Sequence, residues 1–267
     1  MGDESGQKPK ISVIMPAYNE EYNIGEVIQS VQTQTFADWE LIIVNDASTD
    51  KTEEIVKKYF DERIKLINNE KNLGRGASRN KAIAMATGQY IAIWDADDTC
   101  DKTRFEKQVK FLDENSDVAV CGSWGRKIVG DKVYEFKHPL SYDIIRKGII
   151  KRMLVIHSSV FIRSTVAKEN LYNPKFKRSQ DYELFLRLVK KYKVVNIPEF
   201  LIDFDASHSH IKKVRSQLWH IKSVFYAIFF HGYSKKYLFR IPVLFFLVLF
   251  PENMKKWAKK VLRLENW

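Results

Sequence analysis

The sequence predicts an α/β fold built on a mostly parallel, doubly wound sheet. Four short apolar runs alternate with segments of helical periodicity over residues 11–94. Runs of this length, without polar alternation, are typical of strands that are buried on both faces. Strands that alternate with helices form parallel sheets through right-handed crossovers. In such sheets the ligand crevice lies beyond the carboxyl ends of the strands, so we expect a binding site there.

The first half of the chain is regular. Its expected strands are Ile11–Met15, Leu41–Val44, Ile64–Ile67 and Tyr90–Trp94. Apolar residues recur at helical spacing between the first two strands, over 24–31. Asp50 and Glu53 have the spacing of a capping box that opens a second helix. A third, alanine-rich helix is expected over Gly76–Thr87, where Gly88 stops it.

After Asp98 the pattern is less regular and predicts an α+β half. The expected elements are a helix through Phe105, Val109 and Leu112, a strand Val118–Cys121, a hairpin Lys127–Val133 turning at Gly130-Asp131, a strand His157–Ile162 and a helix Asp181–Lys191.

Composition fits a globular protein of a reducing compartment. The chain has 267 residues, 45% of them hydrophobic, which suffices for one large domain or a domain with an appendage. Two cysteines, Cys100 and Cys121, do not make a disulfide framework. Residues 1–9 are polar and lack the apolar stretch of a secretory signal. We therefore expect a cytoplasmic protein.

The C-terminal part has a different composition. Residues 211–267 hold twelve Lys and Arg and two acids, and so ten of the eleven net positive charges of the chain. Ile241–Phe250 is apolar but half as long as a bilayer span. Met254–Leu262 has a basic amphipathic pattern that includes Trp257. These features predict peripheral binding to an anionic membrane surface at its cytoplasmic face, and no nucleic-acid partner.

Asp46 follows the second expected strand in VNDASTD. A carboxylate at this position can accept a hydrogen bond from the imide N–H of uracil. The alternative is a turn aspartate that binds its own backbone.

Asp95, Asp97 and Asp98 directly follow the fourth expected strand. In an extended segment Asp95 and Asp97 point the same way and can face one ligand. Three carboxylates within four residues repel one another, which favours a site for a hard divalent cation such as Mg²⁺ or Mn²⁺. The alternative is a solvated acidic turn.

Two further motifs are candidates for binding and catalysis. Arg75 and Arg79 lie at the start of the third helix, where helix N–H groups and guanidinium groups both favour phosphate, although a surface arginine pair is equally compatible. Asp181 follows Gln180 at the start of a later helix and is either a helix cap or a general base for an acceptor hydroxyl.

Together these segments resemble a known family. ISVIMPAYNE, VNDASTD, GRGASRN, the strand before DADD and RSQDYELFLRL occur in the order of the inverting glycosyltransferases often called family 2, over roughly residues 10–200. The resemblance implies a GT-A fold, a nucleotide-diphospho-sugar donor and a Mn²⁺ or Mg²⁺ cofactor. It implies the following roles: Pro16, Ala17, Tyr18 and Glu20 line the nucleotide pocket, Asp46 reads the base, Asp95 contacts the ribose or the metal shell, Asp97 binds the metal, and Asp181 is the catalytic base.

The chain departs from the family pattern at two places. Gln180-Asp181 replaces an acidic pair, and Asp203–His208 replaces a Tyr-Arg-x-His stretch without its arginine, which weakens any ligand role for His208 or His210. The Gln-x-x-Arg-Trp signature of processive synthases is absent, so transfer of a single sugar is expected.

We therefore expect a polar extension over residues 1–9, a GT-A domain over 10–210 and a membrane-associating tail over 211–267. The domain would divide into a nucleotide-sugar half, 10–100, and an acceptor half, 101–210. The expected activity is metal-dependent transfer of one sugar, hexosyltransferase-type, in the synthesis of a cell-surface polysaccharide, lipopolysaccharide or glycolipid. Asp46 favours a UDP-linked donor over a GDP-linked one. The alternatives are a nucleotidyltransferase and a non-enzymatic basic adaptor for membrane or nucleic acid.

Overall fold

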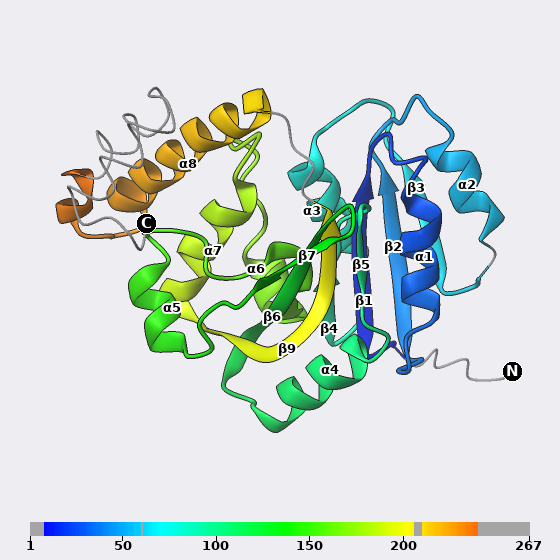
Figure 1. The fold of residues 1–267 in the computed structure, drawn as a ribbon, viewed down its shortest axis with the longest axis horizontal. Coiled ribbons are helices and arrows are strands. Elements are labelled where there is room, and N and C mark those ends of the chain that lie inside the picture. The colour runs from blue at the N-terminus through cyan, green and yellow to red at the C-terminus, as the bar shows by residue number, and fades with distance from the viewer. Residues whose placement is uncertain (1–7, 60, 206–209, 240–267) are drawn as a thin grey trace, which may run out of the picture.

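The computed structural model describes residues 8–59, 61–205 and 210–239. In this part of the chain one sheet runs through the molecule in the strand order β3-β2-β1-β4-β8-β6-β9-β5, with β7 paired to β6 (Figure 1). Helices cover both faces of the sheet. The sequence-based prediction of an α/β fold with a mostly parallel sheet in its first half is confirmed.

The first half of the sheet is parallel. It consists of β1 (Ile11–Ala17), β2 (Trp39–Asn45), β3 (Ile64–Asn68) and β4 (Tyr90–Ile93). All three pairs, β1 with β2, β1 with β4 and β2 with β3, are parallel. Their carboxyl ends therefore meet at one edge of the sheet, as expected from the alternating pattern.

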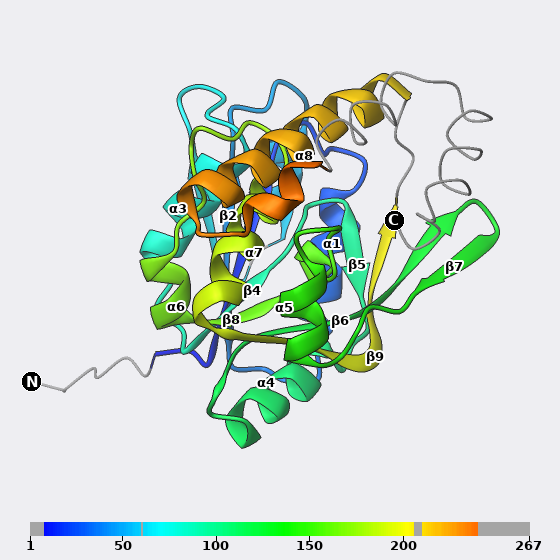
Figure 2. The same cartoon turned by 90° about the vertical axis from the view of Figure 1, so that its left-hand side faces the viewer.

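The second half of the sheet is mixed. It consists of β5 (Asp98–Cys100), β6 (Val118–Val129), β7 (Lys132–Phe136), β8 (Phe161–Arg163) and β9 (Lys193–Asp205). β8 is antiparallel to β4 and to β6, whereas β6 and β9 are parallel. The expected hairpin is confirmed, since β6 and β7 are antiparallel around Gly130, which has φ +55°. It projects from the body of the molecule (Figure 2).

Two helical layers enclose the sheet (Figure 1). Alternate residues of β1 divide between them, since Val13 packs into one cluster and Ile14 into the other. The first layer contains α1 (Ile24–Gln32), α2 (Thr52–Lys58) and α4 (Arg104–Glu114). The second contains α3 (Arg75–Met85), α5 (Tyr142–Gly148), α6 (Ser164–Glu169), α7 (Gln180–Lys191) and α8 (His210–Phe230).

Two local predictions were wrong. Residues His157–Ser159 form a 3-10 turn, η1, and only Phe161–Arg163 pair as a strand. Side chains, instead of a neighbouring strand, satisfy backbone carbonyl groups here. The Ser159 hydroxyl donates to the carbonyl of Ile156, and Arg104 donates to the carbonyl of Ser158. The capping box before α2 also does not form. Its Asp50 accepts from Thr52, and Glu53 instead pairs with Lys57.

α8 packs against α7 and contributes to the core. Val224, Ala227 and Ile228 of α8 are buried in the same cluster as Phe185 and Leu188 of α7. The part of the expected tail that α8 forms is therefore continuous with the folded domain. Ile241–Phe250 and the amphipathic segment with Trp257 lie outside the described residues. Of the helices described, none has the length and hydropathy that crossing a bilayer requires.

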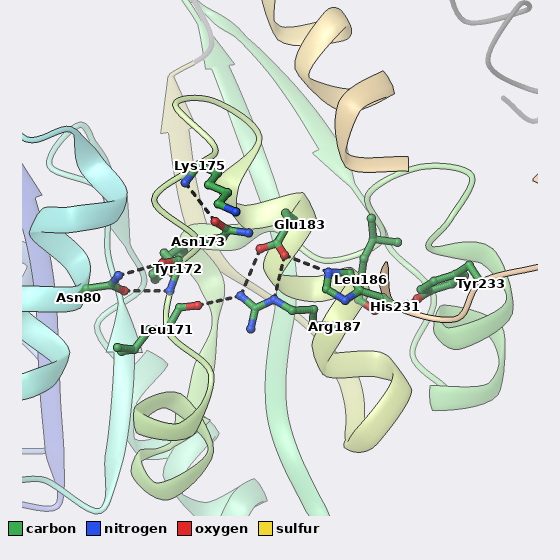
Figure 3. A network of polar contacts seen from close by, with 10 residues as sticks. All are labelled: Asn80, Leu171, Tyr172, Asn173, Lys175, Glu183, Leu186, Arg187, His231 and Tyr233. Carbon is green, nitrogen blue, oxygen red and sulfur yellow. Dashed lines mark hydrogen bonds and ion pairs between the residues drawn. The ribbon is translucent and has the colours of Figure 1, made fainter. Parts of the chain in front are cut away.

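A buried carboxylate joins α7 to the end of α8 (Figure 3). Glu183 is fully buried and accepts from Arg187 Nε at 2.9 Å and from Arg187 Nη2 at 3.1 Å. His231, directly after α8, places Nε2 3.1 Å from the same carboxylate. Arg187 also donates to the carbonyl of Leu171. Burial raises the pKa of Glu183, but the contacts with His231 and Arg187 outweigh it, so the pKa lies below its usual value.

We expect Glu183→Ala to lower the free energy of unfolding by about 3 kcal/mol, because it leaves the half-buried Arg187 without its charge partner. Urea denaturation measures the loss. The matched control is Glu54→Ala on α2, where the pair with Lys58 is exposed and its loss should not be measurable. Equal effects of the two substitutions would contradict a structural role for the Glu183 network.

Candidate functional site

A cavity opens at the carboxyl ends of β1, β2 and β4. The space between its walls, including the open solvent at its mouth, is about 290 Å³, and it lies where the sequence pattern predicts a crevice. The loops after the three strands and the start of α3 supply its walls. The lining residues are Pro16, Ala17, Tyr18, Glu20, Asp46, Arg75, Asp95, Ala96 and Asp97. With the exceptions of Arg79 and Asp181, the structure thus brings together every residue that the sequence predicted for the donor and metal sites.

The loops after β1 and β2 are bonded to each other. Asn19 donates its backbone N–H to Ser48 Oγ, and its side chain accepts from Thr49 N. Asn19 and Ala47 both have left-handed backbones, with φ +55° and +61°. Non-glycine residues adopt this region at a cost, and such residues concentrate at ligand sites. The two loops therefore form one pre-shaped wall of the cavity.

Asp46 organises the loop that leads into α3. Its exposed fraction is 2%, and its carboxylate accepts from Asn69 Nδ2 at 2.8 Å, from Leu73 N at 2.9 Å and from Gly74 N at 2.8 Å. Oδ1 takes two of these bonds and Oδ2 takes one. A carboxylate has about four lone-pair sites, so Oδ2 retains capacity for one further donor. These partners belong to the loop before α3 and not to the turn that contains Asp46, so the bonds differ from those of the expected turn aspartate, and they are compatible with base recognition.

The acidic segment after β4 concentrates negative charge. Carboxylate oxygens of Asp95, Asp97 and Asp98 lie within 4.8 Å of one another. Burial, followed by the neighbouring charges of Asp95 and Asp97, raises the pKa of Asp98 to about 8 against the opposing effects of Ser158 and Arg104. Burial, and then Asp97, also raise the pKa of Glu20 across the cavity. Three oxygen ligands at this separation suit a small divalent cation, whose charge would relieve the mutual repulsion.

Arg79 lies beneath the cavity instead of lining it. Its guanidinium group is buried and pairs with Asp95. Burial opposes the charged form of Asp95, but Arg79 outweighs it and lowers the pKa of Asp95 to about 2. Asp95 is therefore ionised at neutral pH even without a cation. Arg75, one helical turn earlier, is exposed and lines the cavity itself. The two arginines thus have different surroundings, which their spacing did not reveal.

Asp181 lies at the start of α7, next to the start of α3. The side chain of Gln180 rests on Gly76, where a Cβ atom would approach Gln180 Oε1 to 2.8 Å. The residue before the helix, Ser179, has a left-handed backbone with φ +51°. Asp181 is partly exposed, and its carboxylate is close enough to Arg79 to raise the pKa of the Arg79 guanidinium group. α7 thus presents a carboxylate near the floor of the cavity without lining it.

Two residues near the site were missed by the sequence analysis, His157 and Tyr172, and Asp98 was named in the acidic segment without a role of its own. Tyr172 is buried, and its backbone accepts from and donates to the side chain of Asn80 (Figure 3). The guanidinium group of Arg79 lies 5.4 Å from the centre of the Tyr172 ring. His157 bonds to the Tyr172 hydroxyl. The available signal was weak: a single histidine interrupts the apolar stretch before FIR, and a tyrosine stands in a short loop.

Of the residues in the divergent stretch Asp203–His208, Asp203 pairs with Arg126 at 2.7 Å. His208 lies outside the described residues, as does the side chain of His210.

Comparisons with known proteins agree with this geometry. The sequence model of "Glycosyl transferase family 2" matches residues 12–171. A relative from Methanocaldococcus jannaschii, described as the uncharacterized glycosyltransferase MJ1057, is 38% identical over 93% of this chain and 92% of its own length. The putative teichuronic acid biosynthesis glycosyltransferase TuaG of Bacillus subtilis strain 168 is 34% identical, over 69% of this chain and 73% of its own.

A third relative has a defined reaction in its name. It is the UDP-Glc:alpha-D-GlcNAc-diphosphoundecaprenol beta-1,3-glucosyltransferase WfgD of Escherichia coli, 32% identical over 67% of this chain and 70% of its own length.

Solved structures share the fold. Staphylococcus aureus TarS 1–349 in complex with UDP has a TM-score of 0.65 at 23% identity, over 80% of this chain and 65% of that chain. The mannosyltransferase PcManGT from Pyrobaculum calidifontis, in complex with GDP-Man and Mn²⁺, has a TM-score of 0.62 at 19% identity, over 82% and 65%. This chain thus spans slightly less than two thirds of either. The similarity concerns the fold, and it confirms the GT-A fold that the resemblance implied.

Proposed function

Because the chain belongs to glycosyl transferase family 2, we propose that it transfers a single sugar from a nucleotide-diphospho-sugar to an acceptor hydroxyl, with inversion at the anomeric carbon. The observation that carries the proposal is the cavity itself. It combines a carboxylate able to accept from a base, an exposed arginine and a cluster of three carboxylates at the carboxyl ends of parallel strands. A non-enzymatic adaptor would have no use for this arrangement.

The proposed donor carries uridine. The remaining acceptor capacity of Asp46 matches the imide N–H of uracil. UDP appears in the name of WfgD and in the TarS complex, while PcManGT was solved with GDP-Man. Guanosine also has an N–H that a carboxylate can accept from, so a GDP-linked donor is the second candidate.

We propose that Asp97 and Asp95 hold Mn²⁺ or Mg²⁺, with Asp98 as a third oxygen ligand. A divalent cation, when bound, neutralises the diphosphate leaving group. The support comes from the crowding of acidic groups, since a diphosphate would otherwise approach Asp95, Asp97 and Glu20 against their charge. Arg75 is the cationic side chain that lines this cavity and can pair with a phosphate oxygen.

Asp181 is proposed as the catalytic base. Its carboxylate accepts the proton of the acceptor hydroxyl while that oxygen forms a bond to the anomeric carbon. The bond from the anomeric carbon to the diphosphate breaks on the opposite side, which inverts the configuration. The support is its position on α7 near Arg79 but away from the cavity lining, which leaves room for a sugar between base and diphosphate.

The proposed acceptor is a growing glycan or a lipid-linked saccharide, in the synthesis of a cell-surface polysaccharide or glycolipid. The names of TuaG and WfgD, the latter with an undecaprenol-linked acceptor, support this class. A lipid-linked acceptor requires the enzyme at a membrane. We propose that the basic and apolar residues of 211–267 beyond the part packed as α8 bind an anionic membrane surface, from the cytoplasmic side.

Asp97→Ala should nearly abolish Mn²⁺-dependent binding of the donor, because it removes a ligand on the cavity side. Calorimetry with UDP-glucose, UDP-N-acetylglucosamine, UDP-galactose and GDP-mannose, each with and without Mn²⁺, measures the effect and identifies the donor. Asp131→Ala, in the exposed hairpin turn, is the control. Donor binding that is unchanged in Asp97→Ala and insensitive to EDTA would refute the metal site.

Asp181→Asn should lower turnover by about 10²–10⁴-fold, the usual contribution of a positioned base, while donor affinity stays within a few-fold. The amide keeps the size and much of the helix-capping capacity of the carboxylate but cannot take the proton. Asp143→Asn makes the same change in the first turn of α5 and should leave turnover intact. Near-normal turnover of Asp181→Asn would assign the base elsewhere.

The membrane proposal is tested on the full chain, by replacing four lysines of the amphipathic segment with glutamine. Each lysine near an anionic surface contributes about 1 kcal/mol, so sedimentation with phosphatidylglycerol vesicles should fall at least about tenfold. An equal number of exposed lysines elsewhere serves as the control. If both variants bind vesicles like the unaltered protein, the segment does not dock the enzyme. The test residues are Lys255, Lys256, Lys259 and Lys260, and the controls are Lys51, Lys57, Lys58 and Lys71.

A further inference from the structure

His157 lies directly beside the acidic segment. It is the first residue of η1, and the next residue, Ser158, bonds to the side chain of Asp98. The backbone on the far side of the turn is held as well, since Ile93 N donates to the carbonyl of Val160. η1 is thus fixed to the end of β4, where the cation and the diphosphate are proposed to bind.

His157 also contacts the helix that carries the proposed base. Its ring centre is 6.4 Å from that of Phe185, at an interplanar angle of 87°. Phe185 follows Asp181 by four residues, so the two side chains lie on the same face of α7. The imidazole therefore packs on the face of α7 that presents Asp181.

A third contact orients the ring. His157 Nε2 is 2.7 Å from the hydroxyl of Tyr172, and the Tyr172 ring lies next to Arg79, the partner of Asp95. Burial and then Arg79 lower the pKa of His157 to about 4, against the opposing effects of Asp95 and Asp181. The ring is therefore neutral at neutral pH and offers one donor and one acceptor. Tyr172 occupies Nε2, and because the side chain is partly exposed, Nδ1 can meet a ligand.

We propose that His157 hydrogen-bonds to a hydroxyl of the sugar being transferred and contributes to the choice of sugar. The proposal rests on the proposed function, because it needs a donor diphosphate at Asp95 and Asp97 and an acceptor at Asp181. The sugar must lie between these two points. The imidazole of His157 packs against α7 and is within electrostatic reach of both Asp95 and Asp181, so it lies near this space.

The first experiment compares the unaltered protein with His157→Phe and His157→Gln. Calorimetry in Mn²⁺ measures the affinity for the best-bound nucleotide sugar of the panel and for its nucleoside diphosphate. His157→Phe keeps an aromatic ring but loses the hydrogen bond, so sugar-nucleotide affinity should fall about 3- to 10-fold while nucleoside diphosphate affinity stays within twofold. His157→Gln, which keeps a donor and an acceptor, should recover part of the loss. His138→Phe, whose described contacts are with Trp124 and Arg152, is the matched control and should change neither affinity.

The second experiment identifies the hydroxyl. Analogues of the bound nucleotide sugar that lack one hydroxyl at a time are tested against both proteins. For one analogue, loss of the hydroxyl should weaken binding to the unaltered protein about 3- to 10-fold and leave His157→Phe unaffected, which is the signature of a direct pair in a double-mutant cycle.

The outcomes distinguish failure of the proposed function from failure of the proposed role of His157. If the unaltered protein binds no nucleotide sugar of the panel, the proposed function fails and this inference fails with it. If the nucleotide sugar binds but His157→Phe weakens sugar nucleotide and nucleoside diphosphate equally, or no analogue shows coupling, the proposed function stands and His157 has a structural role alone.

Discussion

The ion pair between Arg79 and Asp95 is the contact on which the arrangement of the site depends. A buried guanidinium group loses its hydration and needs a charged partner nearby, and Asp95 provides it. Because Arg79 belongs to α3 and Asp95 follows β4, the pair sets the position of the helix relative to the acidic segment. Tyr172 packs beside the same guanidinium group, and Gln180 at the start of α7 rests on α3 at Gly76. The cavity, the acidic segment and the helix of Asp181 are thus positioned around one charge pair.

The cavity is acidic, although the proposed donor is an anion. The surroundings of each carboxylate determine how much negative charge the cavity carries. Asp95 keeps its charge because Arg79 lies next to it, whereas burial and neighbouring acids favour the protonated form of Asp98. The backbone of this segment is held in place, since the Trp94 indole donates to the carbonyl of Asp98. The protein holds these oxygens close together at a cost in free energy that a divalent cation would recover on binding.

The sequence was sufficient for those parts of the fold and site that depend on local pattern. The apolar runs before Pro16, Asp46 and Asp95 predicted three parallel strands, and the topology of such sheets then predicted that the loops after them share one crevice. Local pattern did not predict the surroundings of Arg79. Its place in the motif is the same whether it faces a phosphate or a buried aspartate, and packing determines which of the two it contacts. His157 and Tyr172 are fifteen residues apart and meet across an irregular segment, so no periodicity connects them. The long strand β9 was also missed, and its pairing with β6 contains register shifts that local pattern does not indicate.

The network around Glu183 has a consequence for exchanging parts between relatives. The helix that carries Asp181 is bonded through Glu183 to His231. Both residues lie beyond residues 12–171, the segment that the family model matches. Tyr233 extends the connection, since its hydroxyl donates to the carbonyl of Leu186. A chimaera joined near residue 210 would combine one protein's α7 with another's α8 and lose this fit. A junction placed after residue 239 would leave α7 with its own partner and exchange only the segment beyond it.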